Sequence, residues 1–257
     1  MGTLTELVDG VRRRMERDPP DEGRSMALAM KRPPARGFER ALREADPPGV
    51  IAEFKRASPS AGEIADVDVA DRARAYEAGG ACAISVLTEP TRFWGALADL
   101  QAARLACRLP VLRKDFLVHP AQVIESRASG ADAVLLIAAA LTELELKALR
   151  STAADLGMDA LVETHSRDDL DKALATDAPV VGVNARDLET LEVDVDRALE
   201  LLSEIPGDRV AVLESGVSSR EQVERALEAG ARAVLVGEAL MRAADPEAMV
   251  RELRGPA

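Results

Sequence analysis

The sequence is poor in aromatic residues, histidine and cysteine. It has 257 residues but only four Phe, one Tyr, one Trp, two His and two Cys. So few aromatic rings argue against the stacking platforms on which proteins hold nucleic-acid bases. Cys82 and Cys107 alone make neither a disulfide framework nor a zinc cluster, so we expect two reduced thiols. His119 and His165 lie far apart without metal-ligand spacing, and we expect no metal site.

Positive charge and long apolar runs are also scarce. Lys and Arg number 33 against 45 Asp and Glu, a net charge of −12. Nucleic-acid-binding proteins usually present a basic face instead, although a local pocket can still bind a small anion. No apolar run reaches the ~18 residues that span a bilayer, and residues 1–6 do not resemble a signal peptide. We expect a cytoplasmic enzyme, acting as a monomer, with no nucleic-acid or membrane partner.

Short apolar runs that alternate with amphipathic segments are the main pattern that is present. Eight runs recur at intervals of roughly 20 to 30 residues, the length of one βα unit. They are Val50–Phe54, Ala81–Leu87, Pro110–Arg113, Ala133–Ile137, Ala160–Glu163, Val180–Val183, Val210–Leu213 and Ala233–Val236. Continuous apolar runs are typical of parallel strands buried on both faces.

The segments between the runs are predicted helices. Leu, Val and Ala recur with helical period over Thr142–Leu156 and Ser219–Ala229. Capping boxes are expected at Thr142 with Glu145 and at Ser218 with Glu221, and glycines such as Gly130 follow the helices. Eight βα units predict a (β/α)8 TIM barrel of the α/β class. An open doubly wound sheet is the alternative, weakened because no Gly-x-Gly-x-x-Gly follows the first strand.

The residues before the first strand are too few for a second domain. We therefore expect one domain over residues 1–257, in which residues 1–48 form a helical N-terminal extension. Helical segments are predicted near Leu4–Glu16 and Gly37–Arg43, joined by a Pro-rich bridge that contains Pro19-Pro20 and Pro33-Pro34. We expect the extension to pack on the barrel and cover one mouth.

Five charged residues lie within or directly after the apolar strands. They are Glu53, Lys55, Lys114, Glu163 and Glu214. Catalytic groups of such barrels lie at the carboxyl ends of the strands, where these residues meet. Buried charges are costly unless paired, so structural ion pairs at the rim are the plain alternative. Five on one face favour a catalytic centre, because a structural rim would tolerate neutral residues.

A second feature lies after the last two strands. Ser215-Gly216 follows the seventh and Gly237-Glu238 the eighth, where such barrels often bind phosphate through backbone N–H groups. Ser58 is placed to add a hydroxyl from across the mouth. Ordinary turns are the alternative, and a Glu238 side chain facing a phosphate would be unfavourable. We expect a structural or supporting role for His165 and a surface position for His119.

Seven motifs, in order, resemble the indole-3-glycerol phosphate synthase family. They are Ile51–Ser60, Ser85–Glu89, Leu112–Phe116, Leu161–His165, Gly182–Leu188, Glu214–Val217 and Gly237–Met241. The resemblance implies a small phosphorylated substrate, 1-(2-carboxyphenylamino)-1-deoxyribulose 5-phosphate, which undergoes ring closure, decarboxylation and dehydration without a cofactor or metal. The product is indole-3-glycerol phosphate, an intermediate of tryptophan biosynthesis.

The same resemblance implies the roles of the residues. Lys114 would be the general acid of ring closure, and Glu163 and Lys55 would move protons in dehydration, in an order left open. Glu53, Asn184, Glu214 and Ser215 would complete the catalytic set. Arg186, Phe93, Phe116 and Leu135 would bind substrate, and Ser58, Ser215, Gly216, Gly237 and Glu238 its phosphate. Desolvation in the apolar slot would lower a lysine pKa, and nearby glutamates would oppose that shift.

Two other functions stay open. Lys114 at a strand end could form a Schiff base, as in an aldolase. A barrel that only binds a phosphorylated ligand would lack a proton-transfer group, and every such group is present here.

Overall fold

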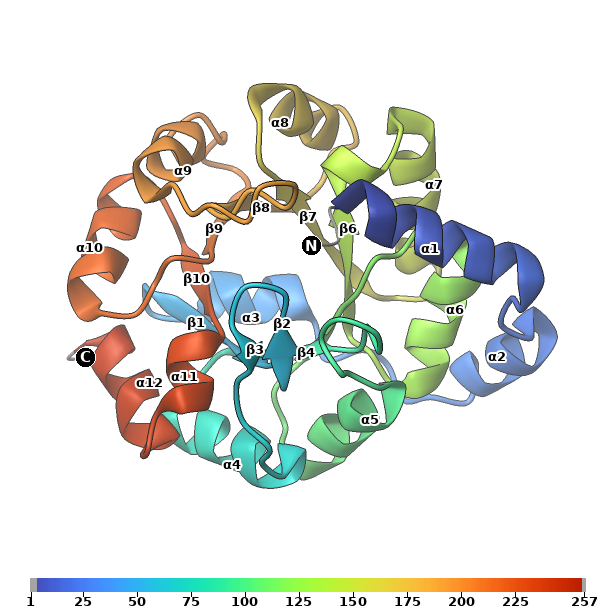
Figure 1. Cartoon of the computed structure of the whole chain (residues 1–257), viewed down its shortest axis with the longest axis horizontal. Helices are drawn as coiled ribbons and strands as arrows, with labels where there is room; N and C mark the ends of the chain where they lie inside the picture. The colour runs from blue at the N-terminus through green and yellow to red at the C-terminus, as the bar shows by residue number, and fades with distance from the viewer. Residues whose placement is uncertain (1–3, 256–257) are drawn as a thin grey trace.

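Eight parallel strands close into a barrel in a computed structural model that describes residues 4–255 (Figure 1). The order around the barrel is β1-β10-β9-β8-β7-β6-β5-β4. The strands are β1 (Gly49–Phe54), β4 (Ala83–Leu87), β5 (Val111–Lys114), β6 (Ala133–Ile137), β7 (Asp159–Thr164), β8 (Val180–Asn184), β9 (Val210–Glu214) and β10 (Ala233–Val236). Each predicted apolar run forms one of them. The pairing of Gly49 with Ala233 closes the ring, so the open-sheet alternative is wrong.

Helices surround the barrel on its outer face (Figure 1). They are α4 (Val69–Gly79), α5 (Leu97–Ala106), α6 (Pro120–Ser129), α7 (Glu143–Asp155), α8 (Arg167–Leu174), α9 (Val195–Leu202), α10 (Arg220–Glu228), α11 (Glu238–Arg242) and α12 (Pro246–Arg254), with a 3-10 turn η1 (Ala138–Ala140). The capping box at Thr142 and Glu145 is confirmed. The one expected at Ser218 and Glu221 is wrong by one residue. There Gln222 reaches back to the N–H groups of both serines, and Ser219 becomes the N-cap.

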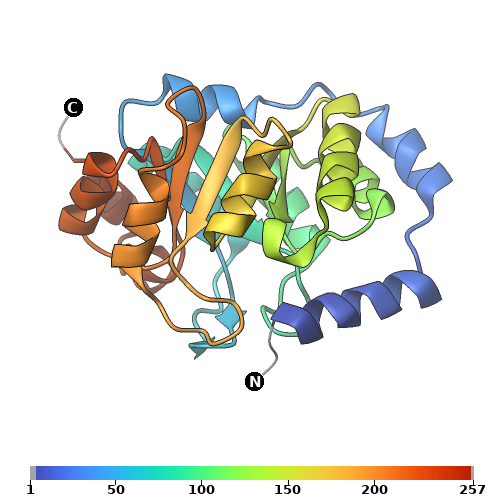
Figure 2. The same cartoon turned by 90° about the horizontal axis from the view of Figure 1, so that it is seen from above.

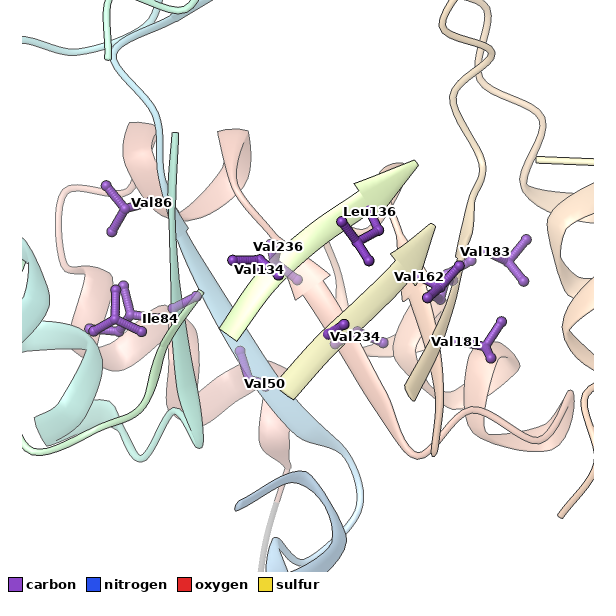
Figure 3. Close-up of a cluster of buried hydrophobic side chains, with 14 of the residues drawn as sticks. Val50, Ile84, Val86, Val134, Leu136, Val162, Val181, Val183, Val234 and Val236 are labelled. Carbon is purple, nitrogen blue, oxygen red and sulfur yellow. The ribbon is translucent and has the colours of Figure 1, made fainter. Parts of the chain in front are cut away.

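The hydrophobic core has two layers, because successive strand residues face opposite sides of the sheet. Residues such as Val50, Ile84 and Leu136 point outward and pack under the helices (Figure 3). Their neighbours, such as Ile51 and Leu135, point inward and fill the barrel. The inner layer is an apolar cluster below the strand ends, and Glu53, Lys114, Glu163 and Glu214 line the cavity above it.

The segment before β1 holds three helices, α1 (Leu4–Arg17), α2 (Glu22–Ala29) and α3 (Phe38–Glu44). The Pro-rich bridge predicted between two helices contains a helix of its own, because α2 forms between the two proline pairs. Asp21 caps it by accepting from the Arg24 N–H, and it packs against α6. Prolines that precede an N-cap or follow a helix do not interrupt it.

The two ends of the barrel are covered differently. Phe38 and Leu42 of α3 are fully buried and close the amino-terminal end. Helix α1 lies at the opposite end, together with the hairpin formed by β2 (Ala57–Ser58) and β3 (Gly62–Glu63) (Figure 2). Within residues 4–255, no helix is both long and apolar enough to cross a membrane.

Candidate active site

A cavity of about 420 Å³ opens at the carboxyl ends of the strands. Its wall contains every residue that the sequence analysis selected: Glu53, Lys55, Ser58, Phe93, Lys114, Phe116, Leu135, Glu163, Asn184, Arg186, Glu214, Ser215, Gly216, Gly237 and Glu238. Leu4 and Leu7 of α1 also line it, as do Leu188 and Leu191 from the loop after β8. The sequence analysis did not select these leucines; the place of Leu4 and Leu7 depends on how α1 packs.

Lys114 lies between two buried carboxylates at the centre of the cavity. Its Nζ is 2.8 Å from Glu163 Oε2 and 3.2 Å from Glu214 Oε2. Asn184 donates from Nδ2 to Glu163 Oε1 at 3.1 Å, so both Glu163 oxygens have a partner. The alternation of each strand aims these four side chains inward from β5, β7, β8 and β9. One cation is therefore shared by two carboxylates that are withdrawn from water.

The pKa values of these three groups are pushed apart. Burial by itself lowers the pKa of Lys114. The attraction of Glu163 and Glu214 outweighs it and holds that pKa above its ordinary value. Burial likewise raises the pKa of Glu163, but Lys114 and hydrogen bonds from Lys114 and Asn184 bring it below its ordinary value. The sequence analysis left open whether burial or the nearby glutamates would decide the lysine pKa. In the structure the glutamates prevail, and Lys114 is held in its charged form.

Glu214 is less well compensated than Glu163, because the attraction of Lys114 does not outweigh its burial. Burial, assisted by the nearby Glu163 charge, raises the pKa of Glu214 to about 8. Neither of its buried carboxylate oxygens accepts a hydrogen bond from the residues that the structure describes. The raised pKa favours the protonated form of Glu214 near neutral pH, beside a charged Lys114 and Glu163.

Two glycines provide the space in which the glutamates lie. An added Cβ at Gly182 would overlap Glu214 Oε1, and one at Gly237 would overlap Glu53 Oε1. Gly182 is in β8, beside Glu214 on β9, and Gly237 directly follows β10, beside Glu53 on β1. A strand glycine often marks such a close approach.

A second ion pair lies beside the first. Lys55 Nζ is 2.9 Å from Glu53 Oε1, and only 4% of the Glu53 side chain is exposed. Lys55 is partly exposed to the cavity. The cavity thus presents two ammonium groups, each held by a glutamate, on its inner wall.

The residues selected for phosphate binding lie together on the wall of the same cavity. Ser215 and Gly216 have φ values of 65° and 74°, so the chain turns sharply after β9. The Ser58 hydroxyl accepts from the Ala61 N–H within the β2–β3 hairpin. Glu238 Oε1 accepts from Arg242 Nε at 2.9 Å, so its carboxylate is paired along α11. The Glu238 carboxylate therefore has a partner other than a bound phosphate. Arg242, which the sequence analysis missed, also lines the cavity.

The apolar slot is built from rings of two neighbouring loops. Phe93 and Phe116 lie with ring centroids 6.2 Å apart at an interplanar angle of 43°, a common geometry for aromatic pairs. Leu135 of β6 lines the same cavity and is 2% exposed. These residues form an apolar wall beside the charged trio.

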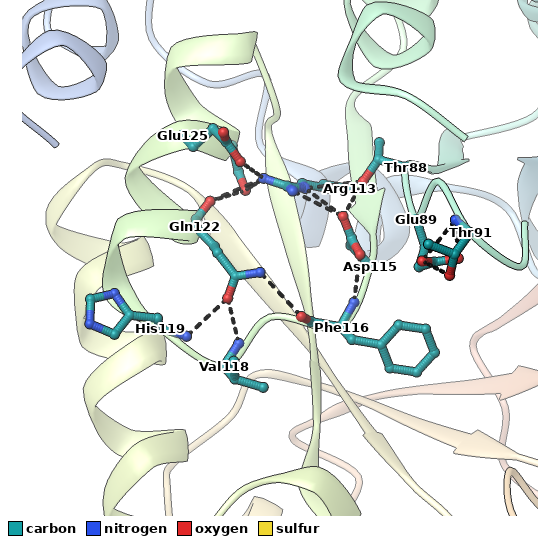
Figure 4. Close-up of polar contacts among 11 residues, drawn as sticks. Thr88, Glu89, Thr91, Arg113, Asp115, Phe116, Val118, His119, Gln122 and Glu125 are labelled. Atoms are coloured by element: carbon teal, nitrogen blue, oxygen red, sulfur yellow. Dashed lines mark hydrogen bonds and ion pairs between the residues drawn. The ribbon is translucent and has the colours of Figure 1, made fainter. Parts of the chain in front are cut away.

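A buried polar network supports the end of β5, which carries Lys114, and the loop that follows it, which carries Phe116 (Figure 4). Arg113 points away from the cavity and pairs with Asp115 at 2.9 Å and Glu125 at 3.0 Å. Asp115 also accepts from the Phe116 N–H at 2.9 Å. The only sequence signal was the pair of charged residues flanking Lys114, to which no role was given.

The two histidines lie outside the cavity wall. His119 is exposed and caps α6, as expected for a surface residue. His165 Nδ1 is 3.0 Å from the Asn184 carbonyl oxygen, in keeping with a supporting role. Within residues 4–255, no group of three or more His, Cys, Asp or Glu side chains is placed to hold a metal ion.

Comparisons with known proteins agree with the motifs. A family model for indole-3-glycerol phosphate synthase matches residues 4–253. The indole-3-glycerol phosphate synthase of Micrococcus luteus is 49% identical, over 99% of this chain and 97% of that protein. The synthase of a Nocardioides species is 47% identical, over 99% of each chain.

Solved structures show the likeness of the fold alone. A 3-hexulose-6-phosphate synthase has a TM-score of 0.63 at 16% identity, over 80% of this chain and 98% of that one. The thiamine phosphate pyrophosphorylase of Pyrococcus furiosus has a TM-score of 0.61 at 16% identity, over 84% and 95%. The family expected from the motifs is confirmed by the full-length matches. The chain belongs to the indole-3-glycerol phosphate synthase family of carboxy-lyases.

Proposed function

We propose that the chain converts 1-(2-carboxyphenylamino)-1-deoxyribulose 5-phosphate into indole-3-glycerol phosphate, CO2 and water. The observation that carries this proposal is Lys114, buried between Glu163 and Glu214 beside an apolar slot. An aromatic ring attacks a ketone only weakly, so the reaction needs an acid at the carbonyl oxygen and a dry, apolar place for the ring.

Lys114 acts as that acid in the first step. The ring carbon that bears the carboxylate forms a bond to C2′, and the C2′ oxygen takes a proton from the Lys114 ammonium. The carboxylate then leaves as CO2, and its bonding electrons restore the aromatic ring. Glu163 keeps Lys114 charged before the reaction, and the contacts with Glu163 and Glu214 hold its Nζ where it must donate.

Dehydration then removes the C2′ hydroxyl as water and one proton from C1′. Glu163 is the candidate base, because Lys114 and Asn184 hold it in the ionised form that can accept a proton. Lys55 is the candidate acid, since its Nζ pairs with Glu53 and is partly open to the cavity. We assign these two roles accordingly, with Glu53, Asn184, Glu214 and Ser215 orienting the lysines and binding the sugar hydroxyls.

The remaining wall residues bind the ends of the substrate. Phe93, Phe116 and Leu135 hold the anthranilate ring, and Arg186 supports binding from the loop after β8. The phosphate lies against Ser58, Ser215, Gly216, Gly237 and the N–H of Glu238, whose side chain is turned to Arg242. The glycines allow the backbone to approach the anion closely.

The test is direct turnover. Purified protein mixed with the carboxyphenylamino substrate should produce indole fluorescence, and folded protein that binds phosphate but forms no indole would refute the proposal. Borohydride with a sugar phosphate should trap no adduct on Lys114; a covalent adduct would favour the aldolase instead. Lys147→Ala, on the exposed face of α7, is the matched control for lysine replacements.

A further inference from the structure

Three polar residues gather behind the cavity wall without touching the cavity. His165 follows β7, Asp187 lies in the loop between β8 and α9, and Arg197 is on α9. Arg197 Nη2 is 2.8 Å from His165 Nδ1 and donates to the Asn184 carbonyl oxygen at 3.2 Å. Arg197 Nη1 donates to the His165 carbonyl oxygen. A single guanidinium therefore ties together the ends of β7 and β8.

Two groups compete for His165 Nδ1: Arg197 Nη2, which only donates, lies at 2.8 Å, and the Asn184 carbonyl oxygen, which only accepts, lies at 3.0 Å. Because the Asn184 carbonyl already accepts from Arg197, we assign Nδ1 as the acceptor of Arg197 and place the ring proton on Nε2. Nε2 faces Asp187 Oδ2 at 3.3 Å. His165 thus links Arg197 to Asp187, and all three side chains have a defined direction. We call His165, Asp187 and Arg197 the clamp.

Toward the cavity, the clamp holds Asn184. The backbone carbonyl of Asn184 accepts from Arg197, while its side chain is fixed on both sides. Nδ2 donates to Glu163 at 3.1 Å, and Oδ1 accepts from the Arg186 N–H at 3.0 Å. A shift of the backbone at residue 184 would move the Asn184 side chain away from Glu163. The same shift would displace Arg186.

Away from the cavity, the clamp holds the loop on which α1 rests. Asp187 Oδ1 accepts from the N–H groups of Glu189 and Thr190 at 2.7 and 2.9 Å and so shapes the turn. The Leu188 carbonyl accepts from the Leu4 N–H at 3.1 Å, and Glu189 Oε1 accepts from the Thr5 hydroxyl at 2.7 Å. Leu4 is a wall residue of the cavity, so the cover over the substrate depends on this turn.

We propose that the clamp is a positioning device that sets Asn184 against Glu163 and docks α1 over the cavity. Its kinetic consequences rest on the proposed function, but its structural consequence does not. Since misplacement of a supporting group by about 1 Å can cost ~10²-fold in rate, loss of the clamp affects kcat through Asn184. It affects KM through α1 and Arg186.

The test uses His165→Ala, Asp187→Asn and the control Glu200→Ala, which changes an exposed residue on α9. The rate of trypsin cleavage within α1 measures how firmly this helix is docked, because a docked helix must open before it is cleaved. The cleavage sites in α1 are Arg12, Arg13, Arg14 and Arg17. We expect ~10-fold faster cleavage within α1 for both clamp variants, with KM raised and kcat lowered, and none of these changes in Glu200→Ala. His165→Asn, which keeps an acceptor for Arg197, should recover most of kcat.

Two results would overturn the proposal. One is a His165→Ala protein with a lowered melting temperature but unchanged α1 cleavage, kcat and KM, which would make the clamp merely structural. The other is unchanged cleavage and KM in Asp187→Asn, which decides the matter if His165→Ala does not fold. A wild-type protein without turnover would refute the proposed function, while the cleavage comparison would still decide whether the clamp docks α1.

Discussion

Gly182→Ala should damage catalysis more than it damages folding. Gly182 has no contact with substrate in the proposed function, yet its missing side chain is the space that the Glu214 carboxyl occupies. An alanine Cβ there would overlap Glu214 Oε1 and lie 3.2 Å from both Glu214 Cδ and Leu161 Cδ1. Strand β8 is fixed between β7 and β9, so the carboxyl must move rather than the backbone.

The size of each effect follows from where the carboxyl can go. Overpacking a core costs about 1–3 kcal/mol of stability. The cavity on one side of Glu214 gives its carboxyl room to move, so we expect a cost at the lower end of this range. The activity loss should be larger. Glu214 would leave its 3.2 Å contact with Lys114, and a displacement of this order costs ~10²-fold in rate, or about 2.7 kcal/mol of barrier.

Urea unfolding and the indole fluorescence assay measure the two effects separately. Gly207→Ala is the matched control, because an added Cβ there meets nothing within 4 Å and its stability should change by less than about 0.5 kcal/mol. In a Glu214→Ala background the clash is gone, and Gly182→Ala should then cost almost nothing. A kcat/KM within twofold of wild type, or an equal stability cost in both backgrounds, would refute the reasoning.

Three further variants test the same site. Lys114→Ala should abolish turnover but leave substrate affinity, measured by calorimetry, within about tenfold, because proton donation acts on the transition state; lost binding with intact turnover of bound substrate would contradict this. Glu214→Gln should flatten the pH dependence of the free energy of unfolding. The pKa of Glu214 is raised from 4.5 to about 8, so the contribution of Glu214 to this free energy is complete below pH 4.5 and is lost as the pH rises through about 8. Urea midpoints from pH 5 to 9 should fall more steeply in wild type than in the variant, and parallel curves would show that Glu214 is not the group concerned. Asp115→Ala should cost about 3 kcal/mol by leaving Arg113 with one carboxylate, and should lower kcat as the end of β5 that carries Lys114 loosens; an unchanged melting temperature would count against the network.

Most of the barrel could be predicted because its signals are local. Eight apolar runs at βα spacing leave few arrangements, and each run forms one strand of the closed sheet. The failures arose where neighbouring side chains compete. Gln222 reaches two serines and moves a helix start by one residue, while Asp21 caps a helix between proline pairs. The β2–β3 hairpin was missed because two-residue strands carry no periodicity.

The site could be predicted as a set of residues but not as a set of interactions. Parallel strands deliver their carboxyl ends to one rim, so Glu53, Lys114 and Glu163 had to meet. Which carboxylate pairs with Lys114, and which keeps a proton, depends on differences of under 1 Å that no spacing encodes. Leu4 entered the wall only through the docking of α1 on the loop after β8.

The raised pKa of Glu214 lowers the negative charge of the cavity wall, which favours an anionic substrate in an acidic chain. Lys114 faces two glutamates and Lys55 a third, so with every carboxyl ionised this wall would carry excess negative charge. With the Glu214 pKa raised to about 8, the charges of the two lysines balance those of Glu53 and Glu163 near neutral pH. Above that pH the wall should turn negative, so substrate affinity should weaken as the pH rises through about 8. Protonation of Glu214 thus avoids a buried negative charge in the fold and also reduces the repulsion between the cavity wall and an anionic substrate.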